Sequence, residues 1–176
     1  MQVRLARGDD AAAVERIRIG AWRVAYRDIL PPADLDAMGI DASRWRTRFD
    51  SPPAGWTTFV AERDSSLIGF AAMGPSRDEP DVGELYAIYV VPDDWSSGVG
   101  RALIVQAEEQ LARAYSLATL WVLTGNARAR RFYELAGWRP DGSVKAEDIF
   151  GVAAEETRYR KELRRAARAA GDHARA

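Results

Sequence analysis

GELYAIYVVPDDWSSGVGR, residues 83–101, is the stretch that decides the fold of this chain. Residues 85–91 are rich in β-branched and aromatic side chains and contain no breaker, which predicts a strand. Pro92 ends that strand because proline has no N–H to donate to a neighbouring strand. The glycine-rich residues 96–100 then lead into residues 101–113, where apolar side chains recur three or four positions apart and predict a helix.

The glycine-rich turn before this helix is a candidate anion site. The first turn of a helix leaves several backbone N–H groups unpaired, and Gly98 and Gly100 would let an anion approach them closely. The turn lacks the Gly-Lys-Ser/Thr of a Walker loop and the third glycine of a dinucleotide-binding fingerprint. A Gly-x-Gly before a helix is also an ordinary turn and cap, so this stretch alone leaves both interpretations open.

The composition excludes several function classes. A chain of 176 residues with 47% apolar and 29% charged residues predicts one soluble globular domain. The net charge of −1 provides no basic field for nucleic acid or a membrane surface. The chain has no cysteine and its single histidine is His173, so we expect no disulfide, no cysteine nucleophile, no Ser-His pair and no metal site. We find no signal-peptide core and no apolar run near the ~20 residues that span a bilayer, and we expect a cytoplasmic protein.

The N-terminal part is predicted to be a strand followed by a long helix. Residues 2–7 alternate in polarity, and Gly8-Asp9-Asp10 offers an N-cap for a helix that continues to about Tyr26. One apolar face of this helix, expected to pack in the core, consists of Val14, Ile17, Ala21 and Val24. A second, aromatic face, which is either a further part of the core or the wall of a pocket, consists of Ile19, Trp22 and Tyr26.

The remaining chain predicts strands and helices with no internal repeat. We expect short helices at 34–38 and 41–49, a hairpin of strands 56–61 and 67–73, and an apolar strand at 118–123. Asn126 begins a helix at 127–136, and Gly137 closes it at the C′ position. A strand begins at Trp138, the polar residues 141–151 match no clear pattern, and the last strand covers 156–163. We expect a single domain over residues 1–163 and a solvated Ala/Arg-rich tail at 164–176.

Two blocks of this sequence resemble the motifs of a known family. Residues 84–103, ELYAIYVVPDDWSSGVGRAL, are similar to the acetyl-CoA motif of the GNAT superfamily of acyl-CoA-dependent N-acetyltransferases, and residues 120–138, LWVLTGNARARRFYELAGW, look like its second cofactor motif. The order of elements fits from Val3 to Leu163, and residues 21–31 resemble a subgroup of small bacterial members. The resemblance implies a mixed α/β fold: a central sheet of six or seven strands with helices on both faces, antiparallel in its first four strands and open in a V at one parallel pair.

The resemblance implies acetyl-CoA as co-substrate. Backbone amides at residues 97–102 would hold the pyrophosphate, although Trp95 stands where the family usually has Gln or Arg, and Ser96 and Ser97 replace a glycine and a basic residue. We expect the binding mode to survive, with two hydroxyl donors gained. The pantetheine arm would pair with the central strand, and the N–H of Tyr89 or Val91 would polarise the thioester carbonyl. The implied cofactor-binding residues are Ile88, Tyr89, Val90, Val91, Ser96, Ser97, Gly98, Val99, Gly100, Arg101, Ala102, Asn126, Arg130, Phe132 and Tyr133.

Two side chains take catalytic roles through the resemblance. The Tyr133 hydroxyl would protonate the leaving thiolate, whereas the alternative is a core aromatic beside Phe132. Glu84 would act as general base for the amine, directly or through a water. The alternative for Glu84 is a solvated carboxylate at a strand end. In that case the acceptor amine would arrive at the site already neutral and would need no general base. Asn126 would bond to the pantetheine arm, although helix capping alone also explains it.

The implied reaction is direct transfer of acetyl from acetyl-CoA to the primary amine of a small molecule in a ternary complex, which the absence of a cysteine to carry the acetyl group supports. An aromatic pocket with one carboxylate would suit an acceptor with an apolar or cationic body and fit a bulky acidic acceptor poorly. A peptide or protein N-terminus is the other amine class.

The alternatives to an enzyme are a non-catalytic acyl-CoA sensor on the same fold and an interaction protein in which the glycines only make a turn. Homodimers are common among proteins that resemble this one. The expected acceptor residues are Trp22, Tyr26, Glu84 and Tyr86.

Overall fold

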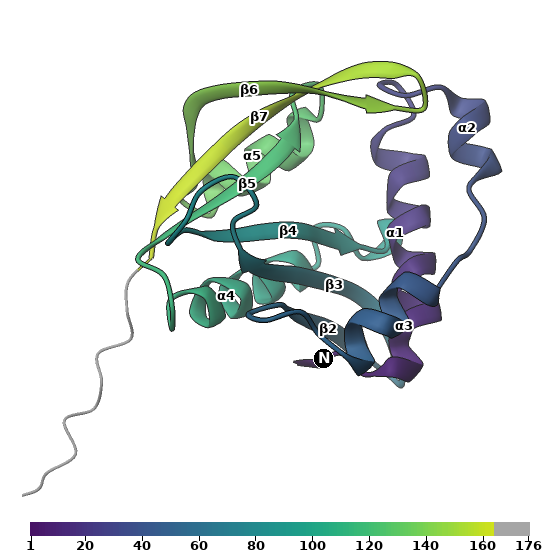
Figure 1. Ribbon diagram of the computed structural model, residues 1–176. Helices are drawn as coiled ribbons and strands as arrows, with labels where there is room; N and C mark the ends of the chain where they lie inside the picture. The colour runs from purple at the N-terminus through teal and green to yellow at the C-terminus, as the bar shows by residue number, and fades with distance from the viewer. Residues whose placement is uncertain (164–176) are drawn as a thin grey trace, which may run out of the picture.

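Seven strands form one sheet in the order β1-β2-β3-β4-β5-β7-β6, in a computed structural model that describes residues 1–163 (Figure 1). The predicted tail, residues 164–176, lies outside the described residues. The strands are β1 (Gln2–Leu5), β2 (Thr57–Arg63), β3 (Ser66–Pro75), β4 (Gly83–Val90), β5 (Leu117–Leu123), β6 (Arg139–Ile149) and β7 (Val152–Glu162). The helices are α1 (Ala11–Ala25), α2 (Pro32–Ala37), α3 (Ser43–Asp50), α4 (Val99–Leu111) and α5 (Ala127–Leu135), with 3-10 turns at Gly8–Asp10 and Pro92–Asp94.

β4 and β5 part from each other over most of their length. The strands β1 to β4 are antiparallel neighbours, as predicted, and β4 then pairs with β5 in parallel only at Gly83–Ala118 and Glu84–Thr119. Beyond these two pairs β5 follows β7, with which it pairs along its whole length. The edge of β4 that faces β5 is therefore left without a partner strand in the centre of the sheet (Figure 1). This V-shaped opening confirms the predicted fold class.

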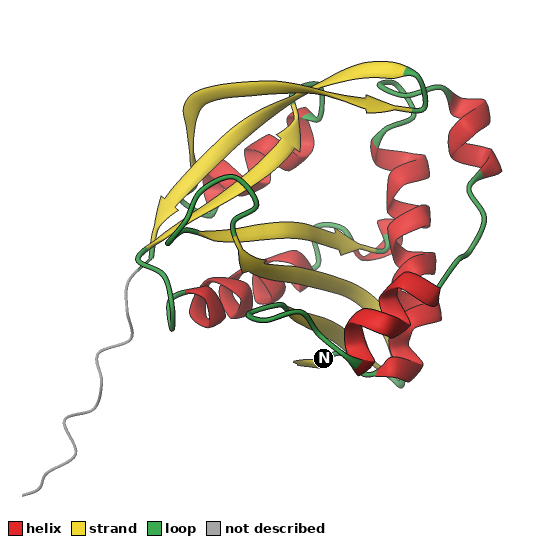
Figure 2. Cartoon of the chain, in the orientation of Figure 1, coloured by secondary structure: helices red, strands yellow, loops and turns green. Residues whose placement is uncertain are grey.

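Helices cover both faces of the sheet, and the alternation of side chains along β3 shows why (Figure 2). Phe70 and Ala72 pack on one face with α1 and α3, whereas Ala71 and Met73 pack on the other face with α4. Both sides of the strand are apolar because both are buried. The helix α5 joins the cluster on the α4 side of the sheet. None of the helices within residues 1–163 has the length and apolar content required to span a bilayer.

Three expectations about local structure change. Val24, expected on the core face of α1, is 52% exposed, because only one side of this helix faces the sheet at its C-terminal end. Asp10 does not cap α1 with its side chain; its carboxylate accepts hydrogen bonds from the Arg7 N–H at 2.8 Å and from the Arg4 guanidinium. The polar residues after Trp138 form β6, an edge strand whose many exposed side chains obscure the strand pattern.

The capping signals around α5 are confirmed. The Oδ1 of Asn126 accepts the Ala129 N–H at 3.0 Å and caps the start of the helix. Gly137 has a φ of 87°, and the next N–H, that of Trp138, donates to the Tyr133 carbonyl at 3.0 Å. These two ends fix the direction of α5, which carries several of the predicted site residues.

Candidate active site

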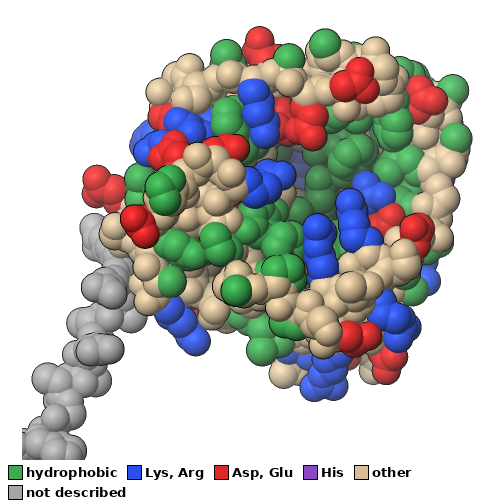
Figure 3. Space-filling model, in the orientation of Figure 1, with side chains coloured by type: hydrophobic (Ala, Val, Ile, Leu, Met, Phe, Trp, Pro, Cys, Tyr) green, Lys and Arg blue, Asp and Glu red, His purple; other side chains and the backbone are tan. Residues whose placement is uncertain are grey.

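A cleft of about 1180 Å³ lies where β4 and β5 part, with an apolar floor and charged side chains at its rim (Figure 3). The predicted site residues that line it are Trp22, Tyr26, Tyr86, Ile88, Tyr89, Val90, Ser96, Gly98, Gly100, Arg101, Asn126, Phe132 and Tyr133. The predicted residues that do not line it are Glu84, Val91, Ser97, Val99, Ala102 and Arg130. The fold therefore brings most of the predicted residues together, from α1, β4, the loop after β4 and α5.

The open edge of β4 presents backbone amides to the cleft. The Val91 N–H donates to the Ile68 carbonyl at 2.9 Å, so it points toward β3. Tyr89 lies two residues away in the same antiparallel ladder, and its N–H faces β3 as well. The expectation that Tyr89 or Val91 donates to a ligand is therefore wrong. The alternate residues, Ile88 and Val90, direct their N–H groups toward β5, from which β4 has parted.

The turn before α4 offers unpaired N–H groups beside this edge. Gly98 has a φ of 92°, a left-handed conformation that a side chain would strain, and no side chain of the described residues caps the helix. The first turn of α4 therefore keeps N–H groups free for an anion. The second hydroxyl donor expected here is lost, because Ser97 donates to the Asp94 carbonyl at 2.7 Å and only Ser96 lines the cleft. Ala102 is no donor either, since its N–H bonds to the Gly98 carbonyl.

Trp95 occupies the position where the resemblance leads to Gln or Arg. Its indole Nε1–H donates to the Val90 carbonyl at 2.9 Å, which anchors the ring beside the open edge of β4. The guanidinium of Arg128, from the first turn of α5, stacks on this ring and lines the cleft. Arg128 thus brings a positive charge to the loop, a role that sequence reasoning missed.

The arginines of α5 divide between structure and site. Arg130, expected to contact the cofactor, donates instead to the Tyr159 hydroxyl at 3.1 Å and to the Thr124 carbonyl at 3.2 Å. Arg128 and Arg131 line the cleft, whereas Arg130 does not. The arginines differ in this way because consecutive helical residues differ in direction by roughly 100°.

Tyr133 has its ring in the core and its edge at the cleft. The residue is 8% exposed, and its ring packs against Phe132 and Trp138. Burial, with a smaller effect of the neighbouring Tyr89, raises the pKa of the Tyr133 hydroxyl. No other described residue forms a hydrogen bond with this hydroxyl, so it can bond to a ligand. Tyr133 is therefore a core aromatic beside Phe132, as the alternative predicted, and it also lines the cleft.

Glu84 is buried behind the cleft. Its side chain is 0% exposed, and its carboxylate accepts the backbone N–H of Arg77 at 2.9 Å and the Arg77 Nε–H at 3.0 Å. The alternative of a solvated carboxylate is therefore wrong. Arg77 neutralises Glu84, so the cleft does not present this carboxylate to a ligand.

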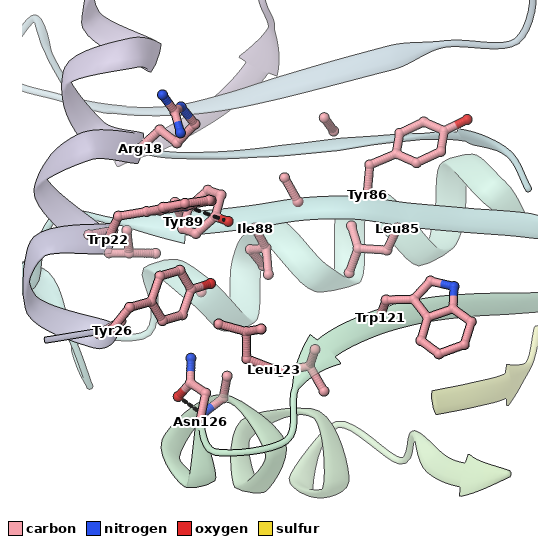
Figure 4. Close-up of a pocket in the computed structure, with 18 of the residues that line it drawn as sticks. Arg18, Trp22, Tyr26, Leu85, Tyr86, Ile88, Tyr89, Trp121, Leu123 and Asn126 are labelled. Carbon is pink, nitrogen blue, oxygen red and sulfur yellow. Dashed lines mark hydrogen bonds between the residues drawn. The ribbon is translucent and has the colours of Figure 1, made fainter. Parts of the chain in front are cut away.

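Aromatic side chains of α1 and β4 form one wall of the cleft (Figure 4). The rings of Trp22 and Tyr26 meet edge to face with centroids 5.1 Å apart, and both line the cleft, whereas Ile19 is buried in the core. The second face of α1 is thus a pocket wall at its two aromatic positions. The Trp22 Nε1–H donates to the Tyr89 hydroxyl at 2.8 Å, and burial raises the pKa of Tyr89 and Tyr26.

Sequence reasoning missed Glu156, which lies on the opposite wall. It is paired with Leu123 of β5, at the end of β5 that has left β4. Its side chain is 15% exposed, with the Lys145 Nζ at 3.3 Å. Burial raises the pKa of Glu156, aided by the Glu147 carboxylate, and outweighs the opposite effect of Lys145. No local pattern distinguished Glu156 from the other charged residues of its strand.

The cleft combines groups that acyl transfer requires. The backbone N–H groups of Ile88 and Val90 face the cleft. Tyr133 contributes a phenol, and Glu156 contributes a carboxyl group with a raised pKa. Within residues 1–163, no three His, Cys, Asp or Glu side chains cluster in a way that could hold a metal ion.

Comparisons with known proteins agree with this chemistry. Residues 19–138 match the model of the acetyltransferase (GNAT) family. The chain is 32% identical to an uncharacterized N-acetyltransferase, YuaI, of Bacillus subtilis (strain 168). The alignment spans 157 residues and covers 86% of this chain and 85% of that protein. The fold of this chain is similar to that of yncA from Salmonella typhimurium, a structure solved with its cofactor acetyl-CoA. The TM-score is 0.73 at 19% identity, and the match covers 94% of this chain and 95% of that one. A ribosomal-protein-alanine N-acetyltransferase from Brucella melitensis matches with a TM-score of 0.72, 22% identity and coverage of 93% and 100%. The chain therefore belongs to the acetyltransferase (GNAT) family, as its two motif blocks predicted.

Proposed function

We propose that this protein transfers an acetyl group from acetyl-CoA directly to a primary amine in a ternary complex. The observation that carries the proposal is the open edge of β4, where the free N–H groups of Ile88 and Val90 lie beside the uncapped start of α4. The first feature suits an extended arm with a carbonyl, and the second suits a phosphate. Membership of the family and a similar fold solved with acetyl-CoA support the same co-substrate.

The residues of the cleft fit this co-substrate along its length. The turn at Gly98, with Arg101 and Arg128, would hold the phosphates. Asn126 uses its Oδ1 in the helix cap and keeps its amide N–H groups for the pantetheine arm. Acetyl-CoA supplies an activated thioester. The amides of Ile88 and Val90 would polarise the thioester carbonyl, a contribution of roughly 10²–10³ in kcat for one such donor.

Attack by the amine forms a C–N bond and breaks the C–S bond, so one proton must leave nitrogen and one must reach sulfur. We assign the proton for sulfur to the Tyr133 hydroxyl, whose raised pKa keeps it protonated until a thiolate forms. For the proton on nitrogen, Glu156 is better placed than Glu84. Glu156 lines the cleft, whereas Glu84 would need to be released by Arg77 before it could act as the predicted base.

The acceptor would enter from the side of Trp22, Tyr26 and Tyr86, the three predicted acceptor residues that line the cleft. Small-molecule amines and peptide N-termini remain the two acceptor classes. The second class gains support from the similar fold whose name describes action on a ribosomal-protein alanine.

A thermal melt with and without acetyl-CoA tests the co-substrate first. Ligand at about a hundred times its Kd adds roughly 2.7 kcal/mol, which corresponds to about 5–10 °C for a chain of this size. Amines are then screened by thiol release. Because the chain has no cysteine, a thiol reagent reports only the released CoA. No shift at millimolar acetyl-CoA, or a shift without thiol release for any amine, would contradict the proposal.

A further inference from the structure

Arginines surround the acceptor side of the cleft. Arg44 and Arg48 extend from α3, Arg18 from α1 and Arg77 from the loop between β3 and β4, and all four line the cleft. In Figure 3 blue side chains stand around the apolar hollow on this side. Glu15 and Glu84 neutralise Arg18 and Arg77 by ion pairs, at 2.6 Å for the first. Arg44 and Arg48 form no ion pair with any residue in the range 1–163, although Arg44 lies close enough to the Glu15 and Asp41 carboxylates to lower their pKa. The Arg48 charge has no such carboxylate beside it within the described structure.

Arg48 is held in place before any ligand binds. Its guanidinium carbon lies 4.4 Å from the centroid of the Trp56 ring. Trp56 in turn stacks on Tyr86, with centroids 4.4 Å apart and planes 17° from parallel. Burial, with a smaller effect of the neighbouring Arg44, lowers the pKa of the half-buried Arg48. A guanidinium fixed by stacking loses little entropy when it binds an anion.

Arg48 lies away from the proposed phosphate site. The column of Arg48, Trp56 and Tyr86 meets β4 at Tyr86, whereas the turn at Gly98 follows the other end of β4. Tyr86 and Val90 alone are separated by about 13 Å along the strand. The phosphate end also has cleft arginines of its own, on α4 and α5. The Arg48 charge is therefore available to the acceptor.

We propose that the acceptor amine carries an anionic group, a carboxylate or a phosphate, that Arg48 and Arg44 bind. This inference rests on the proposed acetyl transfer and specifies its substrate class. The sequence predicted a poor fit for a bulky acidic acceptor, because it placed the Glu84 carboxylate in the pocket. Glu84 is instead buried behind the cleft and paired with Arg77, so that reason no longer applies. The acidic residues of the opposite wall, Glu147 and Glu156, would then face the ammonium end of the acceptor.

The test compares matched amines by thiol release in the presence of acetyl-CoA. β-Alanine is paired with β-alaninamide, and O-phosphoethanolamine with ethanolamine, and a peptide with an acidic second residue is paired with its amide counterpart. We expect the anionic member of a pair to have a larger kcat/KM than the neutral member. Whether the difference is larger in the carboxylate pair or in the phosphate pair shows which anion the arginines bind. Arg48→Ala should reduce this preference by roughly ten- to hundredfold, since hydrogen bonds to charged groups are the strong ones. Salt should reduce it in the wild type as well.

Two further variants separate binding from folding. Arg48→Lys keeps the charge but loses the planar fork, and should retain part of the preference. Arg46 lies on the same helix as Arg48 but does not line the cleft. The Arg46→Ala variant should therefore keep the wild-type preference for the anionic amine. Equal or better acetylation of the neutral members, or an unchanged preference in Arg48→Ala, would overturn this inference alone. No acetylation of any amine would overturn the proposed function and this inference with it, whereas a preserved melting shift with acetyl-CoA would show that the co-substrate site remains.

Discussion

The guanidinium carbon of Arg128 lies 3.8 Å from the centroid of the Trp95 ring. This contact joins the first turn of α5 to the loop before α4, so it bridges the two elements beside the proposed phosphate site. The ring is itself fixed by its hydrogen bond to the Val90 carbonyl. The loop before α4 has Trp95 where the family usually has Gln or Arg. The positive charge beside this loop comes instead from Arg128 of α5.

Arg128→Ala should weaken acetyl-CoA binding by about tenfold, because it removes a charged donor and a stacking contact. Trp95→Ala should act in the same direction, since Arg128 loses its platform. Trp95→Phe keeps a ring for stacking and should lose less. Titration calorimetry of each variant with acetyl-CoA measures the effect. Arg113→Ala, at an exposed position outside the cleft, is the matched control. Wild-type affinity in Arg128→Ala would exclude this arginine from the site.

Tyr133→Phe should lower kcat by about 10²-fold or more while it leaves the acetyl-CoA melting shift intact, because only the proton donor is lost. Tyr159→Phe is the control. Its hydroxyl bonds to Glu134 at 2.9 Å outside the cleft, so the variant should lose about 1 kcal/mol of stability and keep its turnover. Steady-state kinetics and melting curves on both proteins give the comparison. Equal turnover in Tyr133→Phe and the wild type would remove its role as acid.

Glu156→Gln should flatten the rise of kcat/KM with pH on the acidic side. A general base acts only when deprotonated, and burial raises the pKa of Glu156 and moves that rise toward neutral pH. The expected loss of rate at high pH is about 10²-fold or more. Glu84→Gln is measured in parallel. If Glu156→Gln keeps the wild-type pH profile and Glu84→Gln flattens it, the base is Glu84, as the resemblance first implied.

The same variant should change the pH dependence of stability. Because the pKa of Glu156 is raised in the folded state, its contribution to stability is complete below the unfolded pKa and is lost as pH rises through the folded pKa. Glutamine cannot lose a proton, so Glu156→Gln should melt above the wild type at alkaline pH, and the difference should shrink in acid. Melting curves across a pH series test this. A wild type that melts higher than the variant at alkaline pH would show that Lys145 outweighs burial.

Glu15 connects α1 to α3. It is 3% exposed, and its carboxylate accepts the Trp45 Nε1–H at 2.7 Å and the Arg18 guanidinium at 2.6 Å. Burial alone would raise its pKa, but these donors outweigh burial and the pKa is lowered. Glu15→Ala should cost about 3–5 kcal/mol, because it leaves a charge and an indole N–H without a partner.

The sign of the pH effect follows from the lowered pKa. The contribution of Glu15 is present above the unfolded pKa and is lost as pH falls through the folded pKa, so the cost of Glu15→Ala should shrink in acid. Urea unfolding at two pH values measures it, with the exposed Glu109→Ala as control. A cost that does not change with pH would mean that packing, and not the ion pair, carries the effect.

Local signals were read correctly from the sequence where a single residue type dictates the backbone. Pro92, Gly98, Asn126 and Gly137 each stand where the structure ends a strand, adopts a left-handed turn or caps a helix. The strand predicted from Trp138 is β6, but its continuation through the polar residues 141–149 was not assigned. An edge strand with exposed side chains lacks the apolar alternation that marks other strands.

Most of the predicted site residues of β4 line the cleft, whereas Arg130 of α5 does not. Arg130 was chosen over Arg128 and Arg131, since the sequence does not say which side of a short helix faces the cleft. Tyr89 and Val91 were chosen over Ile88 and Val90 for a related reason. The direction of an N–H group in a strand depends on which neighbour the strand pairs with, and that partner lies elsewhere in the chain.

The sequence by itself indicated the family through its two motif blocks. It also determined the strand-turn-helix around Gly98 and the order of the elements, because these follow from backbone preferences and periodicity over short stretches. Only the tertiary structure decided the charges that line the cleft. Glu84 is neutralised by a loop arginine, Glu156 reaches the cleft from β7, and Arg48 is fixed against Trp56 and Tyr86. Each of these contacts depends on strand register and helix docking, which sum many weak interactions between distant segments and leave no local pattern in the chain.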